Sequence, residues 1–481
     1  MTIFITLILG ISISLVLTMV EGARISTIRM ETACAGDIAL QSVLAEYHRE
    51  LWSQYDLFFI DTSYGGEQPD IHNTEERIRC YMNENFRVQN SLVLNPMEKV
   101  RDFLALKAEQ VQLEEIYTAT DLNGKILRRQ ATEYMKQKYG LDMLESVTES
   151  TQELDADWMR ENLAEEKRNQ VKQQIDAIEL PKRQREDGSW EEVPLDNPAD
   201  HVTEIRDKCF YGGAILAYVL GNNVTLSTES VTLAEYFSYR KKLNGNGMNP
   251  ELNWEESIGD KFLFQKYLME KTGSYRAGKE NSRLKYQKEY LLNGEASDLE
   301  NLKKTAVKLV RFREVVNVAY IFTDKGKCSE ARTVAAILTA IMLKPEFLEP
   351  VTDSILLAWA YMESLQDVRC LMQGGKVPIA KTAETWKTGL LGSLLGSSLR
   401  DENGSSVRGL TYDEYLEIFL LKMNLDLKTR RFIDLIEMDI RKTMGNQWFK
   451  MDGCIEGLKA MIQVSSQYGY HYQMERIYGY Q

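Results

Sequence analysis

The longest uninterrupted run of apolar positions lies at the start of the chain. No residue from Ile3 to Val20 is charged, and Glu21 and Arg24 follow directly. A helix of this length rises about 27 Å, close to the ~30 Å hydrocarbon core of a bilayer. The pattern predicts a transmembrane helix over residues 1–22. A cleaved export signal is the alternative, but the run lacks a basic leader and is long enough to span.

Small residues recur on one face of this predicted helix. Gly10, Ser14 and Thr18 are each four positions apart. In lipid, small residues at this spacing allow a second helix to approach closely. We predict that this face packs against a partner helix. The alternative is the ordinary occurrence of Ser and Thr in membrane helices.

Helical patterning continues beyond the apolar run. Leu40, Leu44, Tyr47 and Leu51 recur at spacings of four, three and four residues, and the first proline is Pro69. The pattern predicts that the helix continues as a stalk over residues 23–56, ending near Tyr55. The four apolar residues would pack the stalk against the globular part.

The rest of the chain mixes short strands with helices. In an α+β segment, residues 57–146, we expect strands at 57–60 and 111–120 and helices at 73–86 and 125–139. A polar helix and a flexible linker follow over residues 147–200, with three of the nine prolines between 181 and 198.

Residues 201–481 are predicted to form a helix-rich α+β domain. A short strand is expected at 224–226, and alternating apolar residues predict another at 283–292. Ser297 and Thr411 each precede an acidic residue by three positions, which predicts a helix N-cap. Helices are expected over 299–320, 328–342, 352–372, 412–423 and 428–444. The predicted fold class is therefore α+β with helix dominant.

The composition disfavours several classes of function. The net charge is −13 and the pI about 5.1, so the chain as a whole lacks the basic footprint of a nucleic-acid binder. Its six cysteines are scattered and its four histidines show no paired spacing, which disfavours a metal site. We expect no cofactor, and the sequence identifies no small-molecule substrate.

The candidate chemistry is a set of charged and polar residues in and beside apolar helices. The set contains Arg313, Glu314, Asn317, Asp324, Glu363, Asp367 and Lys376. Glu363 and Asp367, four apart on one helix face, could form an acid/base pair or half a metal site. Such sites need convergent partners, and none is identifiable. A structural ion network with Arg313 and Lys376 as partners is therefore the favoured interpretation, and no enzymatic activity is expected.

Several segments resemble a known family. They are TIFITL (2–7), EGAR (21–24), SVLAEYHRELWSQYDLFFIDTSYGG (42–66), residues 284–324 and residues 358–382. They are similar to a family of uncharacterised clostridial membrane proteins, a domain of unknown function. The N-terminal segment of that family resembles the TadE/TadG-like components of tight-adherence (Tad) pili. The resemblance implies an anchored protein with its bulk outside the membrane and carries no catalytic residue.

One departure from the pilin-like pattern bears on the role. Pilin-like helices carry a glutamate a few residues into the apolar run, whereas this chain has no acid before Glu21. We therefore expect a membrane-anchored structural or assembly component beside other membrane or pilus-like subunits in the cell membrane. Arg24 and Arg29 follow the span, and the positive-inside rule alone would place the bulk in the cytoplasm. A cytoplasm-facing tethered scaffold and a membrane-tethered enzyme using Glu363 and Asp367 stay open as alternatives.

Overall fold

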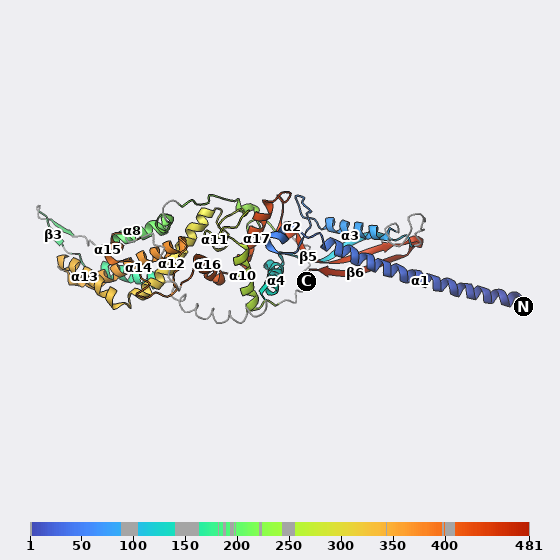
Figure 1. Ribbon diagram of the computed structural model, residues 1–481, viewed down its shortest axis with the longest axis horizontal. Coiled ribbons are helices and arrows are strands. Elements are labelled where there is room, and N and C mark those ends of the chain that lie inside the picture. Colours follow the sequence, from blue (N-terminus) through green and yellow to red (C-terminus); the bar gives the residue numbers. More distant parts are fainter. Residues whose placement is uncertain are drawn as a thin grey trace.

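The structure is a computed structural model of an elongated, mainly helical molecule (Figure 1). It describes residues 2–87, 104–139, 163–180, 182–185, 189–192, 197, 199–220, 224–242, 255–342, 344–396, 399 and 409–480. Helix α1 projects from one end, a small sheet lies beside its inner half, and a helical body forms the other end. The predicted fold class, α+β with helix dominant and a long N-terminal helix, is confirmed.

Helix α1 spans Thr2–Leu44 and has two unlike halves. Its outer half stands clear of the other elements, whereas its inner half packs on the sheet (Figure 1). The buried stripe of the inner half contains Ile28, Ala35, Ala39, Leu40 and Val43. Steps of three, four and seven residues place them on one side of the helix.

The sheet unit has four antiparallel strands and a core of its own. The strands are β1 (Ile60–Asp61), β2 (Lys107–Thr118), β5 (Cys454–Ser465) and β6 (His471–Gly479). Strand β5 is central and pairs with the other three. Helix α1 and helix α3 (Ile71–Phe86) bury their apolar side chains with those of the sheet. Gly36 of α1 lies close to β6: a Cβ there would lie 2.1 Å from Met474 Cε, so the Met474 side chain would have to move to admit a larger residue.

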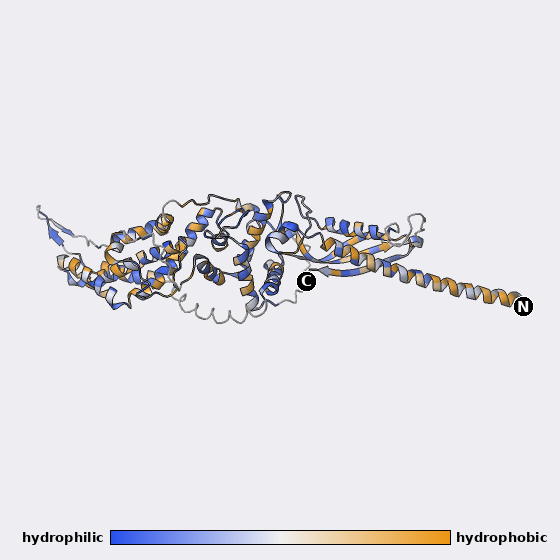
Figure 2. Cartoon of the chain, in the orientation of Figure 1, coloured by the Kyte–Doolittle hydropathy of each residue, from blue (hydrophilic) through white to orange (hydrophobic). Residues whose placement is uncertain are grey.

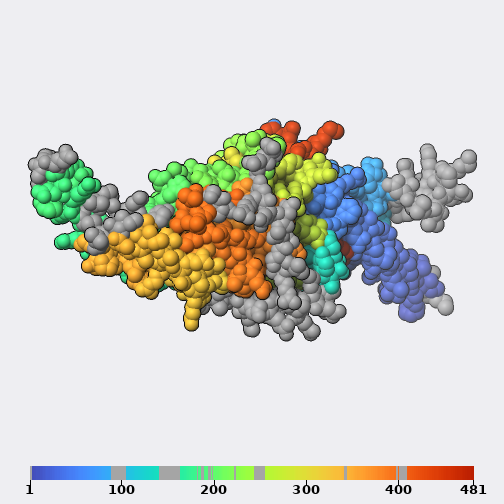
Figure 3. Space-filling view, turned by 60° about the vertical axis from the view of Figure 1, so that its left-hand side comes forward, coloured from blue at the N-terminus to red at the C-terminus, as the bar shows by residue number. Residues whose placement is uncertain are grey.

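The helical body surrounds α14 (Leu348–Met372), which is buried along nearly its whole length. Helices α7, α8, α9, α12, α13 and α15 all contact it. The other helices of the body and its linkers are α4 (Asp121–Tyr139), α7 (Leu163–Asp176), α8 (Ala199–Phe210), α9 (Ile215–Val219), α10 (Ile258–Lys271), α11 (Gln287–Asn293), α12 (Asp298–Ile321), α13 (Lys325–Met342), α15 (Leu390–Leu394), α16 (Tyr412–Lys422) and α17 (Leu425–Arg441). A two-stranded hairpin, β3 (Lys182–Gln184) and β4 (Trp190–Glu192), stands apart from the body (Figure 3).

The predicted continuous stalk to Tyr55 is wrong. Helix α1 ends at Leu44, and a separate helix, α2 (Arg49–Tyr55), follows a turn. The Tyr480 hydroxyl donates a hydrogen bond to the Leu44 carbonyl, and the His48 side chain accepts one from the Leu51 amide at the start of α2. These contacts satisfy backbone groups that a continuous helix would have paired internally.

The four predicted stalk residues consequently do not form one stripe. Leu40 is buried in the sheet unit and Leu44 packs at its edge. Tyr47 lies in the turn, with its ring centroid 5.2 Å from that of Phe58. Leu51 belongs to the core of the helical body.

Two predicted strands are also absent. Residues 224–226 have no regular structure, and the segment 283–292 leads into helix α11. Leu284, Tyr286, Tyr290 and Leu292 are all buried, so the alternation reflected burial rather than extended backbone. Gly294 ends α11 with a φ of 71°, a left-handed conformation that glycine adopts without strain. The predicted caps Ser297 and Thr411 are confirmed at α12 and α16.

Candidate functional site

The outer half of α1 is apolar and fully exposed (Figure 2). Ile3 is 80% exposed, Leu9 57% and Val20 58%. Among the described residues, the helix Ile3–Leu44 is the one long and apolar enough to cross a membrane, and none of its apolar window is buried. A soluble domain rarely leaves so many large apolar side chains uncovered, and lipid is the solvent that would accept them.

The predicted small-residue face of α1 is open. A Cβ placed on Gly10 would meet nothing within 4 Å. The Thr18 hydroxyl donates to the Ser14 carbonyl at 2.8 Å, so its polar group is satisfied inside the helix. The face is therefore open to a second helix, and the Thr18 hydroxyl does not need a hydrogen-bond partner from that helix.

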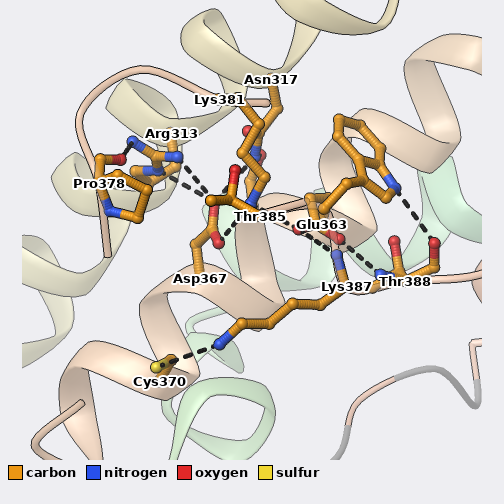
Figure 4. A network of polar contacts seen from close by, with 12 residues as sticks. Arg313, Asn317, Glu363, Asp367, Cys370, Pro378, Lys381, Thr385, Lys387 and Thr388 are labelled. Carbon is orange, nitrogen blue, oxygen red and sulfur yellow. Dashed lines mark hydrogen bonds and ion pairs between the residues drawn. The ribbon is translucent and has the colours of Figure 1, made fainter. Parts of the chain in front are cut away.

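The charged residues on α12 and α14 meet inside the helical body (Figure 4). Arg313 of α12 contacts Asp367 of α14, with its Nη2 3.0 Å and its Nε 3.1 Å from Oδ2. Its Nη1 donates to the carbonyls of Pro378 and Ile379, both at 2.9 Å. Asn317 also donates to Asp367 Oδ2, at 3.2 Å.

Lys381 joins the second carboxylate to this group. Its Nζ lies 2.8 Å from Asp367 Oδ1 and 2.5 Å from Glu363 Oε1. Glu363 also accepts backbone amides from Lys387 at 2.9 Å and from Thr388 at 2.8 Å. We call Arg313, Glu363, Asp367 and Lys381 the ion cluster. It ties α12 and α14 to the segment 377–388.

The ion cluster is closed and electrically balanced. Each of its four side chains is at most 1% exposed, and two cations face two carboxylates. Burial acts to raise the pKa of Asp367, but Arg313 and Lys381 outweigh it and hold that pKa below its usual value. Burial likewise opposes the charge of Arg313, and Asp367 keeps its pKa raised. Donors occupy every carboxylate oxygen of Glu363 and Asp367, so neither acid is presented to a substrate.

The remaining predicted members lie elsewhere. Glu314 turns to the other side of α12, where it pairs with Arg168 of α7. Asp324 accepts the Gly326 amide at 3.0 Å and the Tyr320 hydroxyl at 2.8 Å, and so caps α13. Lys376 is exposed and was wrongly chosen as the partner. The chain after α14 first bridges Val377 to Leu410 and only then brings Lys381 over the carboxylates.

A second set of buried acids, on α17, was missed by sequence reasoning. Asp434, Glu437 and Asp439 are at most 1% exposed. Asp439 accepts hydrogen bonds from Tyr55 at 2.7 Å and Gln287 at 2.8 Å, while Glu437 pairs with Arg240 at 2.7 Å. The signal was available in the run FIDLIEMDI, where acids are spaced three and two apart among apolar residues.

A hollow of about 700 Å³ lies between α7, α8, α12 and α16. It has basic walls, but Arg206 contacts Glu165 at 2.6 Å and Lys308 donates to the Leu292 carbonyl at 3.0 Å. These basic groups already have protein partners, so they do not require a ligand. Within the described residues, no group of three His, Cys, Asp or Glu side chains could hold a metal ion.

Comparison with known proteins gives one match. Residues 188–466 match a family of unknown function (DUF5702), which covers more than half of the chain. The matched region includes the ion cluster and all of α17. No curated protein and no solved structure matches the chain.

Proposed function

We propose a role for this chain from its own physical features, because the family to which it belongs, DUF5702, is a family of unknown function. The role is that of a membrane-anchored structural or assembly component with the bulk of the chain extracytoplasmic. The observation that carries this proposal is the wholly exposed apolar half of α1, continuous with an inner half buried in the sheet unit.

That continuity has a mechanical consequence. Helix α1 runs without interruption from Thr2 to Leu44, so the membrane segment and the sheet unit share one rigid element. The inner half packs against both α3 and β6. Force or orientation set in the bilayer would therefore be transmitted directly to the sheet unit.

The interior of the helical body supports a structural role in place of catalysis. The ion cluster is closed, with every carboxylate oxygen of Glu363 and Asp367 accepting a hydrogen bond or an ion pair. Catalytic acids are held in reach of a substrate and poised to titrate. A tethered enzyme using these two residues would need the cluster to open.

We place the protein beside the membrane components of a Tad-like surface apparatus. The support is the resemblance of residues 2–7, 21–24 and 42–66 to TadE/TadG-like proteins. The absence of an acid before Glu21 favours an anchoring or minor component over a filament subunit. In such an assembly, Gly10, Ser14 and Thr18 would face a partner helix.

The anchor and its orientation are tested together in cells. We expect the full chain to stay in the membrane pellet after carbonate extraction, and an external protease to digest the helical body in intact cells. Release by carbonate would contradict the anchor. Protection from the protease in intact cells, with digestion only after lysis, would support the cytoplasm-facing scaffold.

The partner helix has its own test. Gly10→Leu should abolish cross-linking of α1 to neighbouring membrane proteins, because the added side chain covers the small-residue face. Leu9→Ile is the matched control, since it changes an adjacent apolar position without covering that face. Equal cross-linking in the two variants would remove Gly10, Ser14 and Thr18 from the proposal.

A further inference from the structure

The turn between β5 and β6 lies directly against α1, at the end of the sheet nearest the free half of the helix (Figure 1). Arg24 Nη1 donates to the Gln467 carbonyl at 3.1 Å. Arg29 Nε lies 3.4 Å from the Tyr470 hydroxyl, and its guanidinium lies 5.7 Å from the centre of the Tyr472 ring. Three contacts from two arginines thus hold the turn at residues 24–29 of α1.

This position can be measured from the end of the apolar run. Val20 is the last residue of the uncharged run, and at about 1.5 Å per residue Arg24 lies roughly 6 Å further along the axis. Each headgroup layer of a bilayer is about 5–8 Å thick. If the hydrocarbon core ends near Val20, the β5–β6 turn therefore reaches the headgroup layer.

The side chains of the turn suit that layer. Residues 465–474, SSQYGYHYQM, contain no carboxylate, and the tyrosines Tyr470 and Tyr472 lie beside Arg29. Tyrosine is enriched at membrane–water interfaces because its ring is apolar and its hydroxyl is wet. The nearby acids Glu21 and Glu109 are paired, with Arg24 at 2.8 Å and with Lys107 at 3.0 Å.

We propose that the β5–β6 turn, with the exposed Arg29 beside it, is a second membrane contact that binds the lipid headgroups of the bilayer spanned by α1. The proposal rests on the membrane anchor of the proposed function. Two contacts, a spanning helix and a turn beside it, restrict the tilt of the sheet unit where one helix alone would leave it free. Strand β5 runs from the helical body to this turn, so its twelve residues hold the helical body about 40 Å from the membrane surface.

The test uses the full chain in nanodiscs of phosphatidylcholine and phosphatidylglycerol. Exposed Cys34 and Cys80 are first replaced by serine, and a fluorophore is attached at Gln467→Cys. Ile477→Cys on β6 is the matched control, because it is 61% exposed and about 20 Å along the strand from the turn. Leu15→Cys, 62% exposed on the outer half of α1, reports the anchor itself.

We expect headgroup nitroxide lipids to quench the Gln467 probe at least threefold more than the Ile477 probe. Lipids with the nitroxide on the acyl chain should quench the Leu15 probe. Equal quenching at Gln467 and Ile477, with Leu15 quenched, would overturn the headgroup contact alone. An unquenched Leu15 probe would instead overturn the anchor, and the contact with it.

Discussion

Two long apolar helices of this chain meet opposite environments. The outer half of α1 is exposed throughout, whereas α14 is buried along nearly all of its length. The difference is carried by a few charged residues. Residues 3–20 contain none, while α14 carries Glu363 and Asp367 in its buried C-terminal half.

The comparison shows how charge assigns an apolar helix to protein or to lipid. A carboxylate inside the helical body is tolerated because Arg313 and Lys381 lie within 3.1 Å of the two acids. An isolated span has no such partners, and an ionised group at its centre costs several kcal/mol. The ion cluster therefore stabilises α14 in one packing arrangement, and the uncharged run leaves α1 free to enter a bilayer.

The largest effect should follow from breaking the ion cluster. Asp367→Leu leaves Arg313 and Lys381 buried with one carboxylate between them, which we expect to destabilise the helical body by about 3–5 kcal/mol. Thermal and urea unfolding of the full chain would measure the loss. Lys376→Ala is the control and should change stability by less than about 0.5 kcal/mol, because Lys376 is exposed. Similar losses in both variants would refute the placement of the cluster.

A charge placed in the outer half of α1 should have the next largest effect. Leu9→Arg puts a cation near the middle of the span, at a cost to insertion of about 3 kcal/mol. We expect a larger fraction of this variant than of the wild type to be released by carbonate. Leu9→Phe should behave as the wild type. If the arginine variant stayed entirely in the membrane pellet, the contrast with α14 would be weaker. The apolar half of α1 would then tolerate a charge as the core of the helical body does.

A buried acid that pairs with no cation in the described part of the chain sharpens the comparison further. Glu289 on α11 is fully buried and accepts hydrogen bonds from the Tyr275 amide at 2.8 Å and the Tyr412 hydroxyl at 2.7 Å. Burial raises its pKa from 4.5 to about 7. The folded protein therefore holds a proton on Glu289 at pH 6 that the unfolded chain has released.

This difference in the pKa of Glu289 between the folded and unfolded chain makes the stability of the protein depend on pH. The stability from protonated Glu289 is complete below about pH 4.5 and is lost as the pH rises through about 7. Between pH 6 and pH 8 the loss amounts to about 1–2 kcal/mol. Glu289→Gln should flatten this part of the stability profile, as measured by urea unfolding at each pH. An unchanged slope in that variant would mean that Glu289 is ionised in the fold.

The sequence by itself determined the features that depend on neighbours along the chain. The uncharged run marked a helix long and apolar enough to span a membrane, because hydropathy over about twenty residues is a local property. The caps Ser297 and Thr411 could be predicted because the capping side chain bonds to a backbone amide only three residues further along the chain. The dominance of helix followed from the same local periodicities.

The tertiary structure decided what depends on residues far apart in the chain. Helix α1 ends at Leu44, where Tyr480 from the other end of the chain supplies the last hydrogen bond. The sheet unit is built from residues near both ends, since β5 pairs with β1 and β2 across more than 330 residues. Lys381, and not Lys376, joins the ion cluster because of the path the chain takes after α14. No local sequence pattern predicts these features. They are stabilised by contacts between distant residues, which exist only once the chain has folded.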